Sequence, residues 1–519
     1  MEKTQLNNTK KIAKNTMLLY VRMLITTLIS LFTARLTLQL LGVVDYGINN
    51  LISGIIGFMG IVTGTMTSAT QRFLAYDLGQ HNINQYRCSY SMLLNIFMLF
   101  SLISIVGLEL IGPYLIKSYL VIPPDRIDAS LWLFHFTVIN FILVTINIPQ
   151  TASIVSYEKM GIYAYFTLLD VFFKLLVVYA LYITKIDKLI TLGFLSTLMS
   201  LCVNCITFFY CVKKLDGCRY TLIWDIKLFR KIFTYSGWNL FGSVTGVLNQ
   251  QGQAVLLNLF FGPAVNAAKA VADKINQVIN SFSTNFFMAV TPQIIKSYSS
   301  KNIDYMRKLV LASSRYSFFL LFCLSVPLIA NMKAILCLWL GKEQVSFEMV
   351  RFCQLLLVYS LINVLELPIT QTVRATGNIR KYQVRTGVLT LLFIPICYMI
   401  FSLGMPAYYS MVVLSCIYAL VQIVRVKLIQ EILSITILGY FKIVIVPILK
   451  VVLLSCSMTI LTIKIFNVES ILFLLINVLL EVMFCLVSVL CLGIKSEERN
   501  MVLNYVNNKL KTNVFKKES

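Results

Sequence analysis

Long apolar stretches separated by short polar breaks run along almost the whole chain. Treating each stretch as a helix predicts an all-α membrane protein with about fourteen spans. The spans are predicted to begin near residues 17, 48, 89, 129, 161, 189, 235, 268, 309, 350, 382, 407, 440 and 469. The first, from Met17 to Leu41, has about 25 residues, enough to cross a hydrocarbon layer of about 30 Å.

One face of this first span is polar. Its members are Arg22, Thr26, Ser30, Thr33 and Thr37. At about 100° per residue they fall within a sector less than about 90° wide, and leucines occupy the opposite side. This face therefore predicts contact with water or with polar groups. Arg35 lies about 140° from Arg22, on the leucine side, so either Arg35 reaches the outer interface or the helix bends.

Three further predicted helices carry polar or small residues along one face. The second has Ser53, Gly57, Gly60, Gly64, Thr67 and Gln71, the seventh has Asn239, Ser243, Gly246, Gln250 and Gln253, and the eighth has Asn266, Lys269, Asp273, Asn276, Asn280, Thr284 and Thr291. For the second helix, close packing between helices explains the glycines as well as contact with water does. Together with the first span, these helices predict a hydrated cavity. Its expected lining is Thr26, Ser30, Thr33, Gln250, Gln253, Asn276 and Asn280.

The composition excludes a soluble protein. Apolar residues make up 58% of the 519 residues and the mean hydropathy is +0.80, more than a soluble core needs. The net charge of +23 is not on one surface. With a cytoplasmic N-terminus, about 28 Lys and Arg fall in cytoplasmic segments, about 7 in outward loops and about 10 at membrane depth. This asymmetry predicts a multi-pass protein with an uncleaved N-terminus, both termini cytoplasmic and no nucleic-acid partner.

The two halves of the chain resemble each other at an offset of about 220 residues. Lys10-Lys11-Ile12 matches Arg230-Lys231-Ile232, Ala34 and Gly42 match Ala254 and Gly262, Asn82 matches Asn302, and Asn147-Ile148-Pro149 matches Glu366-Leu367-Pro368. Two six-helix lobes of equal orientation predict a pseudo-twofold axis along the membrane normal, with a substrate space between the lobes.

This repeat predicts five parts. They are an N-terminal six-helix lobe (1–212), a basic interfacial linker (213–234), a C-terminal six-helix lobe (235–433), an extra pair of helices, thirteen and fourteen (434–494), and a basic cytoplasmic tail (495–519). The basic and aromatic residues between Lys213 and Lys231 predict an amphipathic helix lying at the cytoplasmic interface.

Basic residues outnumber acidic ones at membrane depth. Each such charge needs a partner or water, because it costs roughly 2.5–3.5 kcal/mol to insert. Arg22 and Lys269 lie on polar faces, and Arg35 is a third candidate. A cavity with an excess of positive charge suits phosphate or pyrophosphate, which guanidinium and ammonium groups bind strongly where water is scarce.

Acidic residues at membrane depth are the candidates for ion coupling. Asp170 and Lys174 are four residues apart on one helix face, so they are either a self-neutralising pair or a coupling site. Asp273 and Glu366 are further candidates. The chain has two histidines, and no metal cluster, Gly-rich phosphate loop or nucleophile motif stands out. We therefore expect no catalytic residue, no metal, no cofactor and no enzymatic activity.

Several motifs near the N-terminus resemble those of the polysaccharide-export flippases. They are Arg22 and Arg35, Leu41-Gly42, Asp45-Tyr46-Gly47-Ile48, Gln71-Arg72-Phe73-Leu74 and Leu78-Gly79. This O-antigen flippase-like branch belongs to the multidrug/oligosaccharidyl-lipid/polysaccharide exporter superfamily. The resemblance implies a bacterial inner-membrane protein that moves a polyprenyl-pyrophosphate-linked oligosaccharide from the cytoplasmic to the outer leaflet by alternating access. It also implies that Arg22, Arg35 and Lys269 face the cavity and bind this substrate.

The same resemblance implies that helices thirteen and fourteen border a groove for the lipid tail. A proton or sodium ion, membrane lipid and other polysaccharide-assembly membrane proteins are the further partners it suggests. Two alternatives stay open. A cation-coupled multidrug extruder of the same fold would favour an acidic cavity, and a membrane polysaccharide polymerase or ligase would need a sizeable outward loop with catalytic groups.

Overall fold

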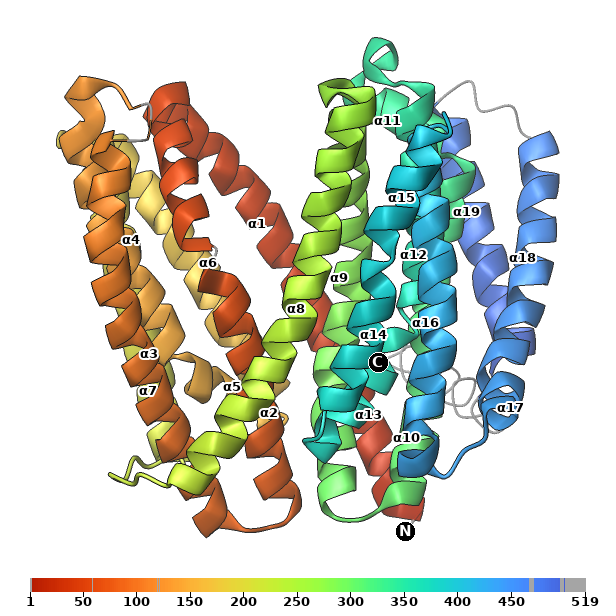
Figure 1. Ribbon diagram of the computed structural model, residues 1–519, viewed down its shortest axis with the longest axis horizontal. Coiled ribbons are helices and arrows are strands. Elements are labelled where there is room, and N and C mark those ends of the chain that lie inside the picture. The colour runs from red at the N-terminus through yellow and green to blue at the C-terminus, as the bar shows by residue number, and fades with distance from the viewer. Residues whose placement is uncertain are drawn as a thin grey trace, which may run out of the picture. The chain divides into compact units, whose positions relative to one another are not determined.

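The computed structural model describes residues 2–57, 59–118, 120, 122–465, 471–494 and 499, and every regular element among them is a helix (Figure 1). The first half contains α1 (Glu2–Gly57), α2 (Met59–Gly79), α3 (Ile83–Ser118), η1 (Pro124–Arg126), α4 (Ile127–Ile146), α5 (Ile148–Ser156), α6 (Met160–Ile183) and α7 (Lys188–Lys214). The all-α fold predicted from the sequence is confirmed. The predicted tail, 495–519, lies outside the described residues except for residue 499.

The second half is also helical. It contains α8 (Ile226–Phe261), α9 (Pro263–Ser299), α10 (Ile303–Ala330), α11 (Met332–Leu340), η2 (Lys342–Gln344), α12 (Phe347–Asn363), α13 (Glu366–Thr376), α14 (Arg380–Leu391), α15 (Phe393–Ser402), α16 (Tyr409–Leu433), α17 (Ile437–Tyr440), η3 (Phe441–Ile445), α18 (Val446–Ile465), α19 (Ile471–Ser488) and η4 (Val489–Gly493). Helices α17, η3 and α18 follow one another without a break and form one membrane-length segment, Ile437–Thr462.

The number of apolar spans is smaller than the predicted fourteen. Among the described residues, eleven helices are long and apolar enough to cross a membrane, or up to twelve if Val44–Gly57 and Met59–Gly79, bent by 47°, form one span. Helices α8 and α9 have 36 and 37 residues but are not among them. Both carry the polar faces described above, and these lower the hydropathy of helices that are long enough to span.

Backbone conformation supports the internal repeat. Gly42 and Gly262 are 220 positions apart, and both have positive φ angles, 77° and 79°, where the first helix of each half gives way to the second. His81 and Lys301, also 220 positions apart, have φ angles of 56° and 58°. Only a few per cent of non-glycine residues adopt positive φ, so this match at an equal offset is strong support for duplicated local structure.

The residues that follow this second pair behave alike as well. The Oδ1 atom of Asn82 accepts a hydrogen bond from the backbone N–H of Gln85 at 3.0 Å, and Asn302 accepts one from Tyr305 at 3.2 Å. Each asparagine thus caps the helix that it precedes, α3 or α10. The halves therefore share turns and caps, not only helix lengths.

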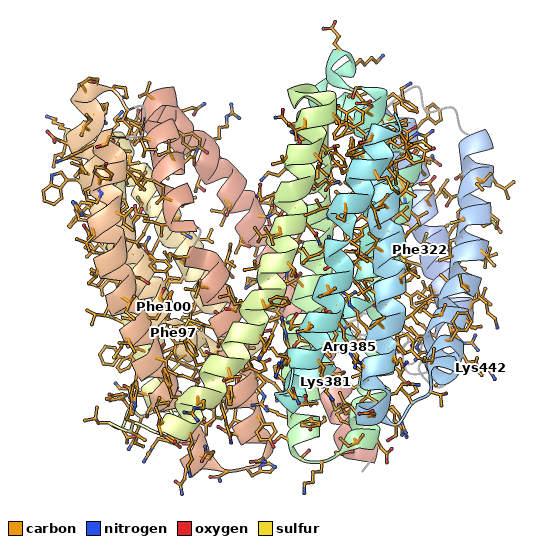
Figure 2. All side chains as sticks on the ribbon, viewed as in Figure 1. Phe97, Phe100, Phe322, Lys381, Arg385 and Lys442 are labelled. Atoms are coloured by element: carbon orange, nitrogen blue, oxygen red, sulfur yellow. The ribbon has the colours of Figure 1, made fainter. Side chains whose placement is uncertain are left out.

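Contacts divide the chain into two compact units. Unit 1 comprises Met1–Val244, Asn285–Met306 and Val373–Gln383, and unit 2 comprises Thr245–Thr284, Arg307–Thr372 and Val384–Ser519. Phe97 on α3 is fully buried in unit 1, and Phe322 on α10 is 2% exposed in unit 2 (Figure 2). Lys442, on the rim of unit 2 in the same view, is exposed, as expected of a lysine that reaches the interface. The predicted lobe boundaries stay a prediction.

The predicted interfacial helix at Lys213–Lys231 is wrong. Helix α7 continues to Lys214, residues 215–225 form no regular helix, and α8 begins at Ile226. The helix ends because the backbone is already extended at Leu215, with φ of −122° and ψ of 124°, and Gly217 follows with a positive φ of 80°. The irregular segment packs on α3, where Asn95 donates a hydrogen bond to the carbonyl of Ile223 at 2.9 Å. Polar side chains of α3 therefore satisfy the backbone that a helix would have satisfied internally.

Candidate functional site

Unit 1 contains a polar cavity of about 340 Å³. Helix α1 contributes residues on both sides of Gly42, and α4, α6 and α7 form the other walls. The polar residues of the lining are Ser30, Thr33, Thr37, Tyr46, Asn49, Asn50, Ser53, Thr137, Asn140, Lys174, Ser196 and Thr197. The volume falls in the range of about 300–1,000 Å³ that is typical of small-ligand sites. Ser30 and Thr33, which the sequence predicts to line a cavity between the lobes, line this cavity within unit 1.

The break at Gly42 lets one chain segment form two walls of this cavity. With φ of 77° and ψ of 172°, Gly42 interrupts α1, and hydroxyl residues before the break meet amide residues after it. Thr33 and Thr37 donate their hydroxyl protons to the carbonyls of Ser30 and Thr33, at 3.0 and 2.8 Å. Because the protons are used within the helix, the hydroxyl oxygens present lone pairs to the cavity.

Arg22 lies on the same helix, about 12 Å before Ser30 along the axis, and like Arg35 and Thr26 it is not part of the cavity lining. Its Nη2 donates to Oδ1 of Asn285 at 2.8 Å, and its guanidinium lies 5.0 Å from the centre of the Tyr163 ring. Its Nε atom is buried without a hydrogen-bond partner, and no described carboxylate forms an ion pair with it. Arg22 is therefore a half-buried cation that is held in place but not neutralised.

Arg35 and Thr26 lie outside the cavity. Helix α1 runs without a break from Arg22 to Gly42, so the bend comes after Arg35 and cannot bring the two arginines to one side. Arg35 is exposed and is not part of the cavity lining. The Thr26 hydroxyl donates to the carbonyl of Met23 at 3.0 Å, and Thr26 is not part of the lining either.

Lys174 lines the cavity and pairs with Asp170. The Nζ atom of Lys174 lies 2.8 Å from Oδ2 of Asp170, and the two side chains are 65% and 38% exposed. Asp170 is not part of the lining. The structure thus shows the i, i+4 pair predicted from the sequence, and it places the positive end of the pair at the cavity wall.

In unit 2 the corresponding positions are occupied by a closed ion pair. Lys269 is 6% exposed, and its Nζ atom lies 2.7 Å from Oδ2 of Asp273. These residues stand 220 positions after Asn49 and Ser53, which line the cavity of unit 1. Asn49 and Ser53 are neutral residues that line a cavity, whereas Lys269 and Asp273, at the equivalent positions of the second half, form an ion pair within one helix.

The remaining polar stripe of unit 2 is largely satisfied internally. Asn280 donates to Asn276 at 2.9 Å and to Ser360 at 3.3 Å, and Ser360 also contacts Asn276. Gln253 is 4% exposed and donates to the hydroxyl of Ser410 at 3.0 Å, whereas Gln250 is exposed. Three of these four predicted cavity residues, Asn276, Asn280 and Gln253, therefore bond to other side chains of unit 2 in the conformation described.

Glu366 has a strong partner. Its Oε2 atom lies 2.8 Å from Nη2 of Arg425, whose side chain is 4% exposed. The pair joins α13 to α16 within unit 2. This ion pair with a buried arginine gives Glu366 a structural role in holding the two helices together.

Sequence reasoning missed a charged cluster beside the break in α1. Arg126 donates to both carboxylate oxygens of Asp45, from Nε at 2.8 Å and from Nη2, and its Nη1 donates to Asp187 at 2.6 Å. Burial tends to raise the pKa of Asp187, but the hydrogen bonds from Arg126 and from the backbone of Ile190 and Leu189 outweigh it and hold that pKa below its ordinary value. Asp45 follows Gly42 closely, so this cluster ties the second part of α1 to α4 and α7.

The cavity residues of α4 and α7 were also missed. Asn140 is an isolated amide in an apolar helix, and that was the available signal. Thr137, Ser196 and Thr197 gave none, because threonine and serine occur throughout membrane helices where they bond to the preceding turn. Among the described residues, no three His, Cys, Asp or Glu side chains gather as a metal site would require.

Comparisons with known proteins agree with this architecture. The sequence model of the MatE family matches residues 253–399, from α8 to α15. No curated protein matches the chain. Solved structures with the same fold include MATE in the straight conformation, with 12% identity and a TM-score of 0.70, and an outward-facing multidrug resistance MATE family transporter of the MOP superfamily, with 10% and 0.69.

A third similar structure is a MOP superfamily transporter from Pyrococcus furiosus, with 11% identity and a TM-score of 0.71, whose binding pocket has a reverse polarity that suggests a different function. Each of the three alignments covers 82% of this chain and 96% of the other. The chain is therefore a multi-pass membrane protein with the MATE fold.

Proposed function

We propose that this protein is an alternating-access flippase that moves a polyprenyl-pyrophosphate-linked oligosaccharide from the cytoplasmic to the outer leaflet of a bacterial inner membrane. The observation that carries the proposal is Arg22. A guanidinium at membrane depth, fixed by Asn285 and Tyr163 and lacking a carboxylate partner among the described residues, suits a strongly anionic ligand.

The chemistry of the cavity supports a sugar as the neighbouring part of this ligand. Its lining combines hydroxyl oxygens that accept hydrogen bonds with asparagine amides that both donate and accept. Sugar hydroxyls have the same dual character. Among the described residues of the lining, only Lys174 is charged, and its positive charge is next to Asp170. A hydroxyl-rich, mostly uncharged group fits this surface better than a lipophilic cation does.

In this mechanism Arg22 binds the diphosphate, the polar cavity takes part of the glycan, and the polyprenyl chain stays in the bilayer. Lys269 is paired with Asp273 in the conformation described, so we propose that it contributes only when that pair opens. Alternating access then exposes the bound head group first to one side of the membrane and then to the other.

The test is flipping of a lipid-linked oligosaccharide in proteoliposomes. Arg22→Ala removes a charge-assisted interaction worth about 1.5–3 kcal/mol, so the apparent affinity for the cargo is expected to fall roughly 10- to 100-fold. Arg351→Ala is the matched control, because Arg351 is an exposed arginine that lies over Phe347 on α12. Arg35→Ala is expected to lose less than Arg22→Ala, because Arg35 is exposed, whereas Arg22 is half-buried and fixed by Asn285 and Tyr163.

Unchanged flipping by Arg22→Ala, with wild-type folding, would contradict diphosphate binding at this residue. Deletion of the gene tests the cargo in cells. The expected result is loss of surface glycan together with accumulation of lipid-linked intermediates inside.

The second candidate is a multidrug extruder, which the match to MATE transporters favours. A drug-sensitive strain lacking its own extruders separates the two, because a flippase is expected to give no resistance. The less favoured alternative, a polysaccharide polymerase or ligase, predicts that unpolymerised glycan accumulates on the outer side, whereas a flippase predicts accumulation inside.

A further inference from the structure

A buried carboxyl group lies outside the sites described so far, where α18 and α19 meet the end of α10. Glu481 on α19 is 0% exposed. Its Oε2 accepts a hydrogen bond from Nδ2 of Asn331 at 2.9 Å, and its Oε1 lies 3.3 Å from the hydroxyl oxygen of Thr462. Asn331 lies between α10 and α11, and Thr462 lies on α18, so the carboxyl joins three parts of unit 2.

The hydrogen-bond network around Glu481 includes one more residue of α19, Asn477, and ends there. Asn477, one helical turn before Glu481, donates from Nδ2 to Oδ1 of Asn331 at 3.1 Å. Asn477 is 0% exposed, and its own Oδ1 has no hydrogen-bond partner. The i, i+4 spacing places this acceptor on the same face as the Glu481 carboxyl. A buried acceptor without a donor, next to a buried acid, marks a place where a proton is missing from the network.

Among the described side chains, no positive charge pairs with Glu481. The charged and titratable groups with described side chains on the elements around it are Lys450 and Cys456 on α18, Asp304, Tyr305, Arg307, Lys308, Arg315, Tyr316 and Cys323 on α10, Lys333 and Cys337 on α11, and Cys485 on α19 itself. Lys464 of α18 lies outside the described side chains. Lys450 and Lys333 are exposed, Arg315 lies about four turns before Asn331, and none forms an ion pair with Glu481 among the described side chains. An ionised carboxylate at such a place is strongly disfavoured.

The groups around Glu481 favour a proton over a metal cation. Asn331 presents its N–H₂ group to the carboxyl, and its carbonyl oxygen is already occupied by Asn477. The Thr462 hydroxyl lies 2.8 Å from the carbonyl of Thr459 and 3.3 Å from Oε1 of Glu481. Its one hydrogen goes to the nearer carbonyl, so its oxygen can accept the hydrogen of a protonated Glu481. A sodium site needs several oxygen ligands at short range, whereas Asn331 turns its N–H₂ group toward the carboxyl and Thr462 stands 3.3 Å away.

We propose that Glu481 is a proton-binding site that couples protonation to the packing of α18 and α19 against α10. When this region opens to water, the Glu481 carboxylate binds one proton and becomes a neutral carboxylic acid. The acid then closes into the apolar interior with Asn331 and Thr462. Reopening toward the other side releases the same proton to water and restores the carboxylate. The coupling to transport rests on the flippase function proposed above.

The position of the cluster gives this site a direction. Asn331 follows the last residue of α10, and Thr462 lies near the end of α18, both at the ends that the predicted topology places outward. A proton therefore enters from the outer side, where the proton motive force supplies it. Helices α18 and α19 come after the repeated halves, so this site has no counterpart in the first half of the chain.

The proton itself is measured by infrared difference spectroscopy on the full-length protein, between about pH 5 and about pH 9, which brackets the ordinary and the raised range of a glutamic acid. The wild type is expected to show a carboxylic-acid C=O band that disappears as the pH rises. Glu481→Gln is expected to lose this titrating band. Glu431→Gln, at an exposed glutamate of α16, is the matched control and is expected to keep it. This measurement needs no cargo.

The coupling is measured in proteoliposomes that flip lipid-linked oligosaccharide with and without a pH gradient, acidic on the outer side. The gradient is expected to accelerate the wild type and Glu431→Gln, and this stimulation is expected to vanish in Glu481→Gln. Glu481→Asp, which keeps a carboxyl, is expected to retain both the band and the stimulation, and it guards against a folding defect in the glutamine variant.

Two results would overturn the proposal. One is a titrating band that persists in folded Glu481→Gln, and the other is full stimulation by the gradient in that variant. If the wild type flips no lipid-linked oligosaccharide at all, the flippase function fails, while the infrared titration still decides whether Glu481 binds a proton.

Discussion

Glu158 shows how one residue can hold several helices together. It lies in the turn between α5 and α6 with a left-handed φ of 59°, and its side chain is 3% exposed. Its carboxylate pairs with Lys11 at 2.8 Å and with Lys296 at 2.6 Å, and it accepts a hydrogen bond from Gln293 at 2.6 Å. The start of α1 and the end of α9 are therefore tied to this turn, within unit 1.

The pH dependence of this cluster follows from its charges. Burial tends to raise the pKa of Glu158, but Lys296 and Lys11 outweigh it and hold that pKa below its ordinary value of 4.5. A lowered pKa in the folded state means that the stabilisation is complete above about pH 4.5 and is lost as the pH falls through the lowered value.

Glu158→Gln is expected to lower the stability at pH 7 by more than about 1 kcal/mol, because two lysines lose their partner. The difference from the wild type is expected to shrink once the pH falls below about 4.5. Thermal unfolding in detergent at both pH values measures this, with Glu431→Gln as the exposed control. A destabilisation that is equal at both pH values would mean that the carboxylate charge is not its cause.

At the scale of an element, the break in α1 decides what the cavity is made of. Gly42 has φ of 77° and ψ of 172°, a combination that is essentially restricted to glycine. A Cβ atom there would meet nothing within 4 Å, so space is not the constraint. The backbone conformation alone requires glycine, and it brings Asn49 and Ser53 to the cavity that Thr33 lines from the other side.

Gly42→Ala is expected to destabilise the protein by about 1–3 kcal/mol through backbone strain, or to straighten α1 at this point. Gly47→Ala is the control, because Gly47 is helical, has equal space around it and is expected to be neutral or slightly stabilised. Thermal unfolding and the flipping rate of both variants provide the measurement. Equal behaviour of the two would show that residue 42 does not need its positive φ.

The two halves of the molecule share backbone conformations but differ in the polar side chains that these backbones carry. Glu158 and Gly377, 219 positions apart, have φ angles of 59° and 79°, so the same turn recurs near the middle of each half. The side chains placed on this frame differ, because a polar cavity in the first half corresponds to hydrogen-bonded polar residues in the second. The same backbone therefore carries a polar cavity in one half and a hydrogen-bonded polar cluster in the other.

The orientation in the membrane is a prediction at this scale. In the predicted topology, Lys342 lies in an outward loop and Lys301 in a cytoplasmic turn, and both are exposed. Lys342→Cys is therefore expected to react with a membrane-impermeant maleimide in intact cells, and Lys301→Cys only after the membrane is opened. The wild type, with its own 13 cysteines, gives the background. The reverse labelling pattern would invert the proposed direction of transport and of proton entry.

The sequence by itself determined the class of the protein, because apolar length and helical periodicity are local properties. It predicted the polar face of α1 and the offset at which the backbone repeats, including the match of Gly42 to Gly262. It also predicted the pair Asp170 and Lys174, since residues four apart on a helix meet whatever surrounds them.

Only the tertiary structure decided which polar groups share a space and which neutralise each other. Asp273, the partner of Lys269, is four residues away in the sequence, but the burial of Lys269 depends on neighbouring helices. Arg126 meets Asp45 and Asp187, and Glu481 meets Asn331, across separations that no local pattern reports. Such contacts depend on how helices pack, and packing is set by many side chains at once rather than by the spacing within one helix.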